Sequence, residues 1–393
     1  MMAVVAIRLL LAALLLVPST PAVARPSPVI DRVVSDLCRR DVVLLGEHAG
    51  HGDGRTIATK TQIVRQLVER CGFNAVLFEA SYYEFANFRR RLHAGEPATR
   101  EMLWSAVGGL WNRYAETQPL IDFLYDRARR RRLFVGGIDD QLSGWRQPYA
   151  NDVMPAELAG LLPAERRTAC EQAMHRRIYS DYPADAPASP ATREQLRGCL
   201  REIRSVLVAR GDSERLPLVD NSEWTIARDF TQPGAPAWMA ARDASMAQNF
   251  AALRAARGPR AKVIVWAATV HVARSASFDA RYTGVDNLGA ALSRAFGRRA
   301  FVLGFGAASG SVMWGGQART VPPVAPDSLE SRALAGTAAD IVYLGGRRLA
   351  GLGEINASLF SIDEPQRAPW SRIVDGAIVF RAEQAPTVAI PFR

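Results

Sequence analysis

The stretch DVVLLGEHAGHGDGRTIATKTQIVRQLVERCGFNAVLFEA, residues 41–80, decides the fold class of this chain. It begins with an apolar run rich in β-branched residues and ends with a second such run, FNAVLFEA. Between the two runs, Ile63, Leu67 and Cys71 fall on one face of a helix that Gly72 stops. Apolar runs of this length are typical of strands that are buried on both faces of a parallel sheet. The stretch therefore predicts a strand, a helix and a second strand in one unit.

The same alternation recurs outward from this stretch. A second amphipathic helix is predicted over residues 117–132, where Leu120, Phe123, Leu124 and Ala128 share a face. Five further strands are predicted in RLFVGGID (132–139), AKVIVWAA (261–268), RAFVLGF (299–305), DIVYLGG (340–346) and SRIVDGAIVFRAE (371–383). The predicted fold class is α/β, with a mostly parallel multi-stranded sheet flanked by helices.

The strand pattern is interrupted between residues 147 and 235. The sequence of this region predicts two or more helices around a turn rich in Pro, Ala and Ser at 183–190. We therefore expect a helical insertion over 147–235 that caps the carboxyl edge of the sheet. The α/β core would then have two parts, residues 25–146 and residues 236–393.

Residues 1–24 have the pattern of a secretory signal peptide. Arg8 precedes an apolar stretch at 9–17, and the small residues Ala22 and Ala24 indicate cleavage after Ala24. The apolar stretch is too short for a bilayer, and no later window approaches the required run of about 20 apolar residues. We therefore expect a periplasmic or secreted protein without a membrane span.

The cysteines and the charge fit an exported globular protein. Four cysteines allow three disulfide pairings, and the local ones, Cys38 with Cys71 and Cys170 with Cys199, are the ones we expect. The formal charge of +10 comes from arginines that lie in predicted helices among acidic residues. Basic helix faces without interleaved aromatic residues do not predict a nucleic-acid partner, although they leave a mild bias toward anionic surfaces.

Polar residues follow the predicted strands at the points where those strands end. Ligands bind outside the carboxyl ends of parallel strands, so these side chains are the candidates for a site. The chain has only five histidines, and three of them are in this set. The set consists of Glu47, His48, His51, Glu79, Asp139, Asp140 and His271.

Each candidate also has a structural interpretation. Glu79 could cap a turn, but a carboxylate in an apolar strand is costly to bury unless it is paired. His271 could be a core histidine bonded to the backbone, and His48 and His51 could be exposed loop residues. Asp139 could orient a histidine.

The chemistry of the set is that of water activation. A histidine beside a carboxylate can act as a general base, because the carboxylate fixes the tautomer and stabilises the imidazolium. A serine nucleophile is not predicted, since no G-x-S-x-G elbow is present. The same glutamates and histidines could also bind a divalent metal, and their spacing alone leaves both routes open.

Several segments in order resemble the erythromycin esterase family over nearly the whole mature chain. They are LLGEHAGHGDG, LVERCGFNAVLFEA, LWNRYAETQPLIDFLYDRA, FVGGIDDQ, ARDASMAQNF, KVIVWAATVHVAR, DNLGAALSRAFGRRAFVLGF and VDGAIVF. The resemblance implies an ester or lactone hydrolase that needs no metal or other cofactor. It implies His51 as general base for the attacking water, with Glu47, Glu79 and His271 as the other catalytic residues.

The chain departs from the family pattern at positions that bear on the substrate. The loop has one residue more between Glu47 and His51 than the G-E-x-x-H-G pattern, so His48 could compete for the role of base. Ala268 and Thr269 replace the His and Asn of W-A-H-N-x-H, and Lys60 replaces an arginine. These changes leave hydrolysis feasible but weaken the expectation of a macrolide substrate.

We therefore expect an exported hydrolase that cleaves a small-molecule carboxylic ester or lactone. His271 would help to stabilise the oxyanion, and the residues expected to bind substrate are His48, Lys60, Arg113 and Asp139. Aromatic side chains that could line the cleft are Trp111, Tyr114, Trp224 and Trp238, although core packing would explain them equally well. The alternative is a non-catalytic periplasmic protein that holds a metal ion or ligand on the same fold.

Overall fold

The computed structural model describes residues 27–142, 147–182, 188–228 and 232–390 of the 393-residue chain. The predicted signal peptide at 1–24 lies outside the described residues, as does most of the predicted turn at 183–190. Within the described ranges, no helix combines the length and the apolarity needed to cross a bilayer.

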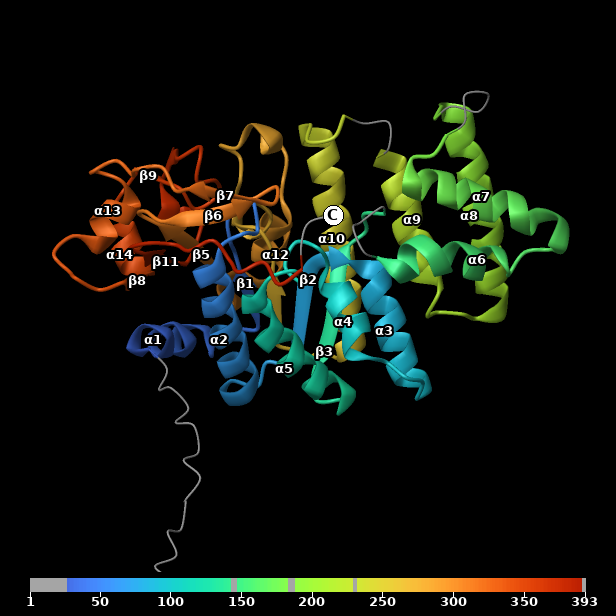
Figure 1. Cartoon of the computed structure of the whole chain (residues 1–393), viewed down its shortest axis with the longest axis horizontal. Coiled ribbons are helices and arrows are strands. Elements are labelled where there is room, and N and C mark those ends of the chain that lie inside the picture. The colour runs from blue at the N-terminus through green and yellow to red at the C-terminus, as the bar shows by residue number, and fades with distance from the viewer. Residues whose placement is uncertain (1–26, 143–146, 183–187, 229–231, 391–393) are drawn as a thin grey trace, which may run out of the picture.

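The predicted strands assemble into one seven-stranded sheet (Figure 1). Its strands are β1 (Val42–Leu45), β2 (Ala75–Ser81), β3 (Phe134–Asp139), β4 (Val263–Trp266), β5 (Ala300–Ala307), β8 (Ile341–Gly345) and β11 (Gly376–Phe380). The order is β3-β2-β4-β1-β5-β11-β8, and every neighbouring pair is parallel except β11 with β8. The predicted α/β fold with a mostly parallel sheet is confirmed.

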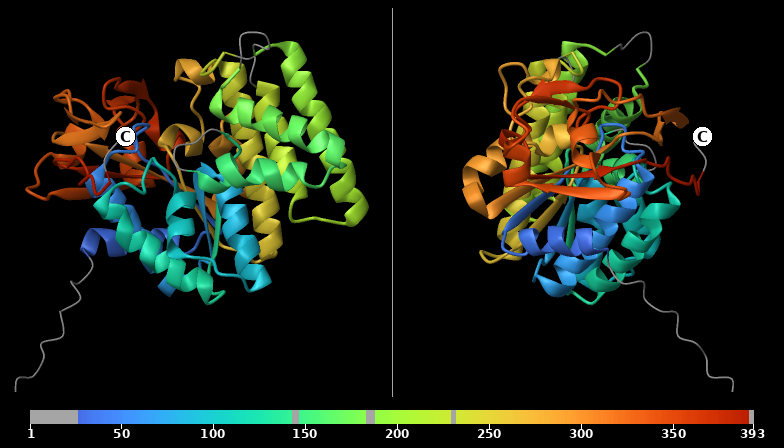
Figure 2. Two further views of the ribbon diagram at one scale, coloured as in Figure 1. Left: turned by 45° about the vertical axis from the view of Figure 1, so that its right-hand side comes forward. Right: turned by 90° about the vertical axis from the view of Figure 1, so that its left-hand side faces the viewer.

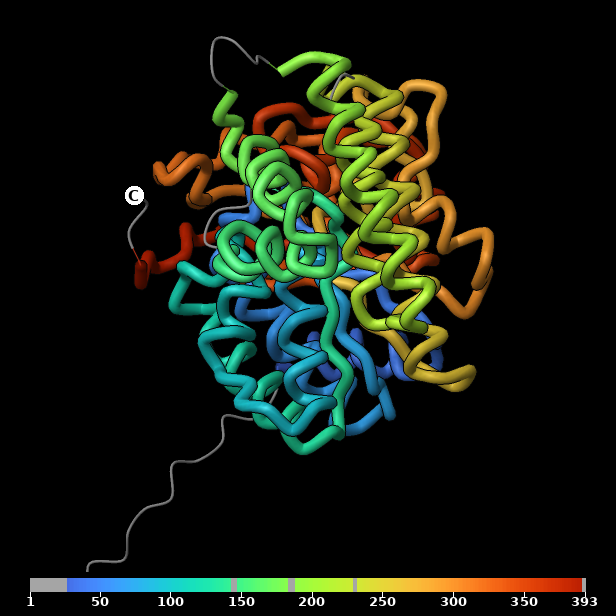
Figure 3. Tube along the Cα trace, turned by 90° about the vertical axis from the view of Figure 1, so that its right-hand side faces the viewer, coloured from blue at the N-terminus to red at the C-terminus, as the bar shows by residue number. Residues whose placement is uncertain are grey.

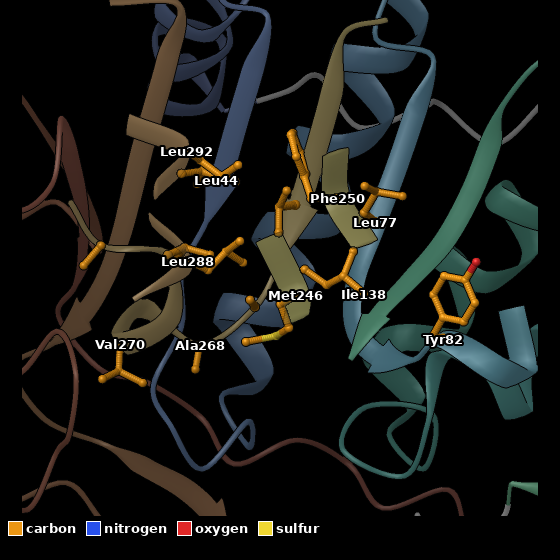
Figure 4. Close-up of a cluster of buried hydrophobic side chains, with 14 of the residues drawn as sticks. Leu44, Leu77, Tyr82, Ile138, Met246, Phe250, Ala268, Val270, Leu288 and Leu292 are labelled. Atoms are coloured by element: carbon orange, nitrogen blue, oxygen red, sulfur yellow. The ribbon is translucent and has the colours of Figure 1, made fainter. Parts of the chain in front are cut away.

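Helices cover both faces of the sheet (Figure 2). Successive strand residues point to opposite faces, so Leu44 packs in one buried cluster and Val43 in the other. The face with Val43 is covered by α1 (Pro28–Leu37), α2 (Gly54–Arg70), α4 (Arg100–Val107) and α5 (Gln118–Arg129). The face with Leu44 is covered chiefly by α10 (Pro236–Arg257), α11 (Thr269–Val272) and α12 (Leu288–Phe296). Figure 4 shows Met246 and Phe250 of α10 packing toward this second face.

The described part of the insertion contains helices and no strands. They are η2 (Tyr149–Val153), α6 (Met154–Ala159), α7 (Ala164–Tyr179), α8 (Pro190–Arg210) and α9 (Leu216–Arg228). Figure 3 shows these helices stacked on one another in front of the core. A disulfide between Cys170 and Cys199 joins α7 to α8, and a second, between Cys38 and Cys71, joins the ends of α1 and α2. Both predicted pairings are confirmed.

Several elements were not predicted from the sequence. Two helices, α3 (Tyr82–Ala94) and α4, lie between β2 and β3 in addition to α5. Two antiparallel strand pairs extend beyond the sheet, β6 (Ser311–Trp314) with β7 (Gln317–Thr320) and β9 (Ile355–Ala357) with β10 (Gln366–Ala368). The remaining short helices are α13 (Leu329–Leu334), α14 (Gly346–Ala350), η1 (Ala115–Thr117), η3 (Ala280–Tyr282), η4 (Gly297–Arg299) and η5 (Trp370–Arg372).

The strand order brings the predicted polar residues into one row. Asp139 ends β3, Glu79 lies near the end of β2, His271 follows β4, and Glu47 follows β1. These four strands are consecutive in the sheet, and all four are parallel. Residues that are up to 224 positions apart in the chain, such as Glu47 and His271, therefore reach the same edge.

Candidate active site

The loop between β1 and α2 holds a glutamate that three side chains contact. Glu47 is fully buried, and its Oε1 accepts hydrogen bonds from Nδ1 of His51 at 2.8 Å and Nε1 of Trp111 at 2.6 Å. Its Oε2 accepts a hydrogen bond from Nζ of Lys60, in α2, at 2.7 Å. Every oxygen of this carboxylate therefore has a donor, which fixes its orientation.

The charges in this first group favour an ionised glutamate. Burial alone would raise the pKa of Glu47, but Lys60 and His51 together hold it below its usual value. Burial lowers the pKa of Lys60 to about 8, against the opposing effect of Glu47. The ammonium also lies 4.0 Å from the centre of the Trp266 ring. Lys60 is fully buried and is not among the residues that line a cavity at this edge of the sheet.

The loop backbone presents His51 in an unusual conformation. His51 has a φ of 55°, a region that few residues other than glycine adopt. The following Gly52 has no room for a side chain, because a Cβ there would lie 2.0 Å from the carbonyl oxygen of Met313. With Nδ1 bonded to Glu47, Nε2 of His51 has no hydrogen-bond partner among the described residues, and 9% of the side chain stays exposed.

His48, the other histidine of the loop, lies apart from this group. Its Nδ1 accepts a hydrogen bond from the backbone N–H of Gly50 at 3.1 Å, and its ring packs against Trp314. Its Nε2 is buried without a partner among the described residues and borders a separate small cavity beside Asp53 and Glu383. Burial lowers the pKa of His48 to about 4, which leaves the ring neutral.

A second group is built around Arg242 of α10. Its guanidinium donates to Oε1 of Glu79 at 2.9 Å and to both carboxylate oxygens of Asp139. Oε2 of Glu79 accepts the backbone N–H of Ala268 at 2.8 Å. Burial would raise the pKa of Glu79, but His271 and Arg242 hold it well below its usual value. The strand-end carboxylate predicted from the sequence is thus paired and ionised.

His271 lies behind Glu79 and is held from both sides. Its Nε2 is 3.2 Å from Oε1 of Glu79 and 3.0 Å from Nη1 of Arg242, and its Nδ1 is 2.9 Å from Oδ1 of Asp243. The hydroxyl of Tyr282 donates to Oδ2 of Asp243 at 2.7 Å. Burial would lower the pKa of His271, but Asp243 and Glu79 raise it to about 9, so the ring is charged at neutral pH.

Asp139, which ends β3, and Asp140, which follows it, have different surroundings. Asp139 contacts Arg242 and borders the large cavity at the sheet edge. Asp140 is fully buried, and its carboxylate accepts a hydrogen bond from Nη1 of Arg228 in α9 at 2.7 Å. Asp140 therefore ties the insertion to the sheet and takes no part in the cavity.

Both groups border one cavity of about 390 Å³. Trp111 comes from the first group, and Glu79 and Asp139 from the second. Arg113 and Tyr114 add to the same wall, whereas Trp224 and Trp238 do not line it. The other lining residues are Gly50, Ala80, Ser81, Val107, Gly108, Gly109, Leu110, Gln141, Leu142, Gln147 and Gly315.

The structure thus brings most of the predicted site residues together. Glu47, His51 and Lys60 form one contact group, and Glu79, Asp139 and His271 belong to the other. Four contact residues were not predicted from the sequence, namely Trp111 as a donor to Glu47, Arg242, Asp243 and Tyr282. Arg242 and Asp243 lie in ARDASMAQNF, which carries part of the family resemblance, so a signal for them was present.

The ionisable side chains at the carboxyl edge of the sheet form ion pairs with one another. Within the part of the chain that the structure describes, no group of three or more His, Cys, Asp and Glu side chains has the arrangement of a metal site. The carboxylates of Glu47, Glu79 and Asp139 each contact a cationic side chain instead.

The chain is similar in fold to several solved structures. A succinoglycan biosynthesis protein superposes with a TM-score of 0.72 at 14% identity, over 93% of this chain and 94% of that one. A Bacillus cereus protein gives 0.67 at 16% identity, over 91% and 92% of the two chains. A variant of the erythromycin esterase EreC in its open conformation gives 0.63 at 15% identity, over 92% and 95%. At these identities the likeness shows the fold alone.

Comparison with the curated proteins finds no match. The family model described as erythromycin esterase matches residues 68–368, which is more than half of the chain. This match, together with the shared fold, confirms the resemblance inferred from the sequence segments. The chain belongs to the erythromycin esterase family.

Proposed function

We propose that this protein is an exported hydrolase that cleaves a carboxylic ester or lactone with water activated by His51. The observation that carries the proposal is the pair of Glu47 and His51, which leaves Nε2 of the histidine without a hydrogen-bond partner among the described residues. His51 does not itself line the cavity, but its ring contacts Trp111, which does. Membership of a hydrolase family supports the reaction class.

The first group supplies the base. The ionised Glu47 keeps the proton of the neutral ring on Nδ1, so Nε2 carries the lone pair that accepts a proton from water. The same carboxylate stabilises the imidazolium that forms when the hydroxide attacks the carbonyl carbon. Lys60 and Trp111 act through Glu47 by holding it ionised and in place.

The second group supplies a fixed charge arrangement at the same cavity. Glu79 reaches the cavity as a carboxylate, where it can accept a hydrogen bond from the attacking water. His271 does not line the cavity, so its positive charge would act on the oxyanion through space and by fixing Glu79. Arg113 and Asp139 line the cavity and are the predicted substrate contacts that reach it.

We also infer that residues 147–235 form a cap that affects access to the site. Of this region, Gln147 is the one described residue that lines the cavity, so the cap would act mainly by supporting the wall before it. Export is inferred from the signal peptide pattern at 1–24, and the two disulfides support it, because disulfides persist in oxidising compartments.

The proposal is tested by ester hydrolysis with matched loop variants. Purified protein would be assayed against aryl esters, lactones and macrolides, with and without a chelator. We expect His51→Ala to lower kcat/KM by about 10²–10⁴-fold, the usual contribution of a general base. The control His48→Ala should keep most of the activity, because His48 faces a different cavity.

Two results would contradict the proposal. If His48→Ala lost as much activity as His51→Ala, the base would have to be reassigned. If no ester or lactone were hydrolysed and the protein bound one metal ion per chain, the non-catalytic alternative would replace it. An active enzyme that is indifferent to the chelator supports water activation by His51 without a metal.

A further inference from the structure

A second cavity, of about 270 Å³, lies at the opposite edge of the sheet from the candidate active site. It is formed where α3, α5 and α10 end and where β3 begins. Its cationic members come from two arginine-rich segments, FRRRLHAG at 88–95 and RARRRR at 127–132, and from the end of α10. The proposed function uses none of these residues. The lining consists of Arg89, Leu92, His93, Ala128, Arg131, Leu133, Phe134, Val135, Ala256 and Arg257.

The charged side chains that line this cavity are all basic, and the carboxylate of Glu214 lies outside the lining, 3.9 Å from Nδ1 of His93. The lining has three arginines and a histidine, and the other lining residues are apolar. Among the described residues, Arg89, Arg131 and Arg257 have no carboxylate within ion-pair distance, in contrast to arginines such as Arg90 and Arg127, whose partners are Glu157 and Glu69. Like charges that share a small space repel one another, and an anion between them would remove that cost.

Each of the three guanidiniums is held by a backbone carbonyl. Arg89 donates to the carbonyl of Val135, Arg131 to that of Leu92 and Arg257 to that of Asn74, each at 3.3 Å. A guanidinium has five N–H groups, so these bonds leave donors for a ligand.

Arg89 shows a further sign of an unbalanced cation. The Arg89 guanidinium lies over the rings of Phe134 and Tyr82, at 5.2 and 5.8 Å from their centres, and burial lowers its pKa. The φ of 56° at Arg131 belongs to the left-handed turn that ends α5, where the N–H of Arg132 donates to the carbonyl of Arg127.

We propose that this cavity binds a small oxyanion that carries an apolar group, such as an aryl or alkyl phosphate. The oxyanion would accept hydrogen bonds from Arg131 and Arg257, whose planar guanidiniums match its geometry. The apolar group would pack on Leu92, Leu133 and Phe134. The volume lies below the range of about 300–1,000 Å³ typical of sites for drug-sized ligands, so the ligand is small.

The competing explanation is that the arginines only stabilise the carboxyl ends of the neighbouring helices. The carboxyl ends of helices attract cations, and two of the bonded carbonyls, those of Leu92 and Asn74, lie near such ends, whereas that of Val135 lies in β3. This explanation predicts that removal of a charge lowers stability and leaves anion binding unchanged. The two explanations therefore differ in a binding measurement.

The test uses calorimetric titration of the full chain with phenyl phosphate. We expect saturable binding that weakens as salt is added. Arg131→Gln and Arg257→Gln should each weaken it about tenfold or more, because a hydrogen bond to a charged group contributes about 1.5–3 kcal/mol. Arg132→Gln is the matched control, since Arg132 is exposed beside Arg131 but does not line the cavity. His51→Ala should bind normally, which separates this site from the active site.

Each result of the phenyl phosphate titration supports or overturns the proposed anion site. Absence of saturable binding to the unmodified protein, or equal weakening by Arg132→Gln, overturns it. Equal affinity for inorganic phosphate overturns the apolar part of the site, and equal affinity for benzyl alcohol overturns the role of the anion. Loss of binding in His51→Ala would place the ligand in the active-site cavity instead.

Discussion

At the scale of single residues, Trp111 connects the cavity wall to His51, the proposed base. Its indole N–H donates to Oε1 of Glu47, the oxygen that also holds His51, and its ring meets that of His51 edge to face at 5.0 Å. Trp111→Phe keeps an aromatic ring in the wall but removes this donor. We expect kcat/KM for ester hydrolysis to fall by about tenfold or more, the usual effect of losing a hydrogen bond to a charged group.

The matched control for this prediction is Tyr114→Phe, a neighbouring change in the same wall. It should leave kcat nearly unchanged, because Tyr114 has no hydrogen bond to the Glu47 carboxylate. If Trp111→Phe were as active as the unmodified protein, the indole would only fill space.

Replacement of Arg242 should also lower the rate of hydrolysis. One guanidinium spans Glu79 and Asp139, and a lysine ammonium cannot reproduce this planar contact. Arg242→Lys should therefore keep the charge but release one carboxylate, and we expect kcat to fall while the folded state persists. Steady-state kinetics measures the fall in kcat, and circular dichroism shows whether the variant is still folded. An unchanged kcat would mean that Arg242 does not position Glu79 and Asp139 for the reaction.

The site residues divide into those that local sequence predicts and those that it does not. Glu47, His51 and Glu79 were predictable because each follows or ends an apolar run, and parallel strands place such residues at one edge. Arg242 and Trp111 contact them from a helix and a connection that are distant in the chain. Their contacts depend on how α10 and the α4–η1 connection pack, and no local periodicity encodes that packing.

At the scale of elements, the segment 383–390 after β11 works as a strap. Glu383 accepts hydrogen bonds from the backbone N–H of Arg55 and the hydroxyl of Thr56, at the start of α2. Further along, the carbonyl of Thr387 accepts the N–H of Ala115 at 2.9 Å. The strap thus joins the helix after the His51 loop to the wall that carries Arg113 and Tyr114.

Truncation of the strap should weaken substrate binding. A chain ending at Gln384 keeps Glu383 but loses the bonds to residues 113–116, so we expect a higher KM for the ester substrate with a smaller change in kcat. A chain ending at Ile390 is the control and should behave as the full chain does. Equal KM values for the two truncated proteins would show that the strap does not position the wall.

The elements differ in how well the sequence predicts them. All seven strands of the sheet were predicted, because burial on both faces requires an unbroken apolar run. The pair β6 and β7 was not, since β7 is exposed along its whole length and has no apolar pattern. The strap forms no helix or strand and pairs with the core only through isolated bridges at Glu383 and Val388, so no local pattern in its sequence indicates its contacts.

At the scale of the whole molecule, the buried charges of the second group make folding stability depend on pH. Asp243 and Glu79 raise the pKa of His271 from 6.5 to about 9, although burial opposes them. The folded protein therefore keeps a proton that the unfolded chain releases above pH 6.5. The stabilisation is complete below pH 6.5 and is lost as the pH rises toward 9.

We expect the free energy of unfolding to fall by about 3 kcal/mol over this interval from His271 alone, since each pKa unit corresponds to about 1.4 kcal/mol. Urea unfolding at a series of pH values between 6 and 9.5 measures the fall. His271→Gln should remove this part of the slope, because glutamine does not titrate. The exposed His93→Gln should leave it unchanged. Parallel pH profiles for His271→Gln and the unmodified protein would mean that the His271 ring is already neutral in the folded state and accepts a hydrogen bond from Nη1 of Arg242.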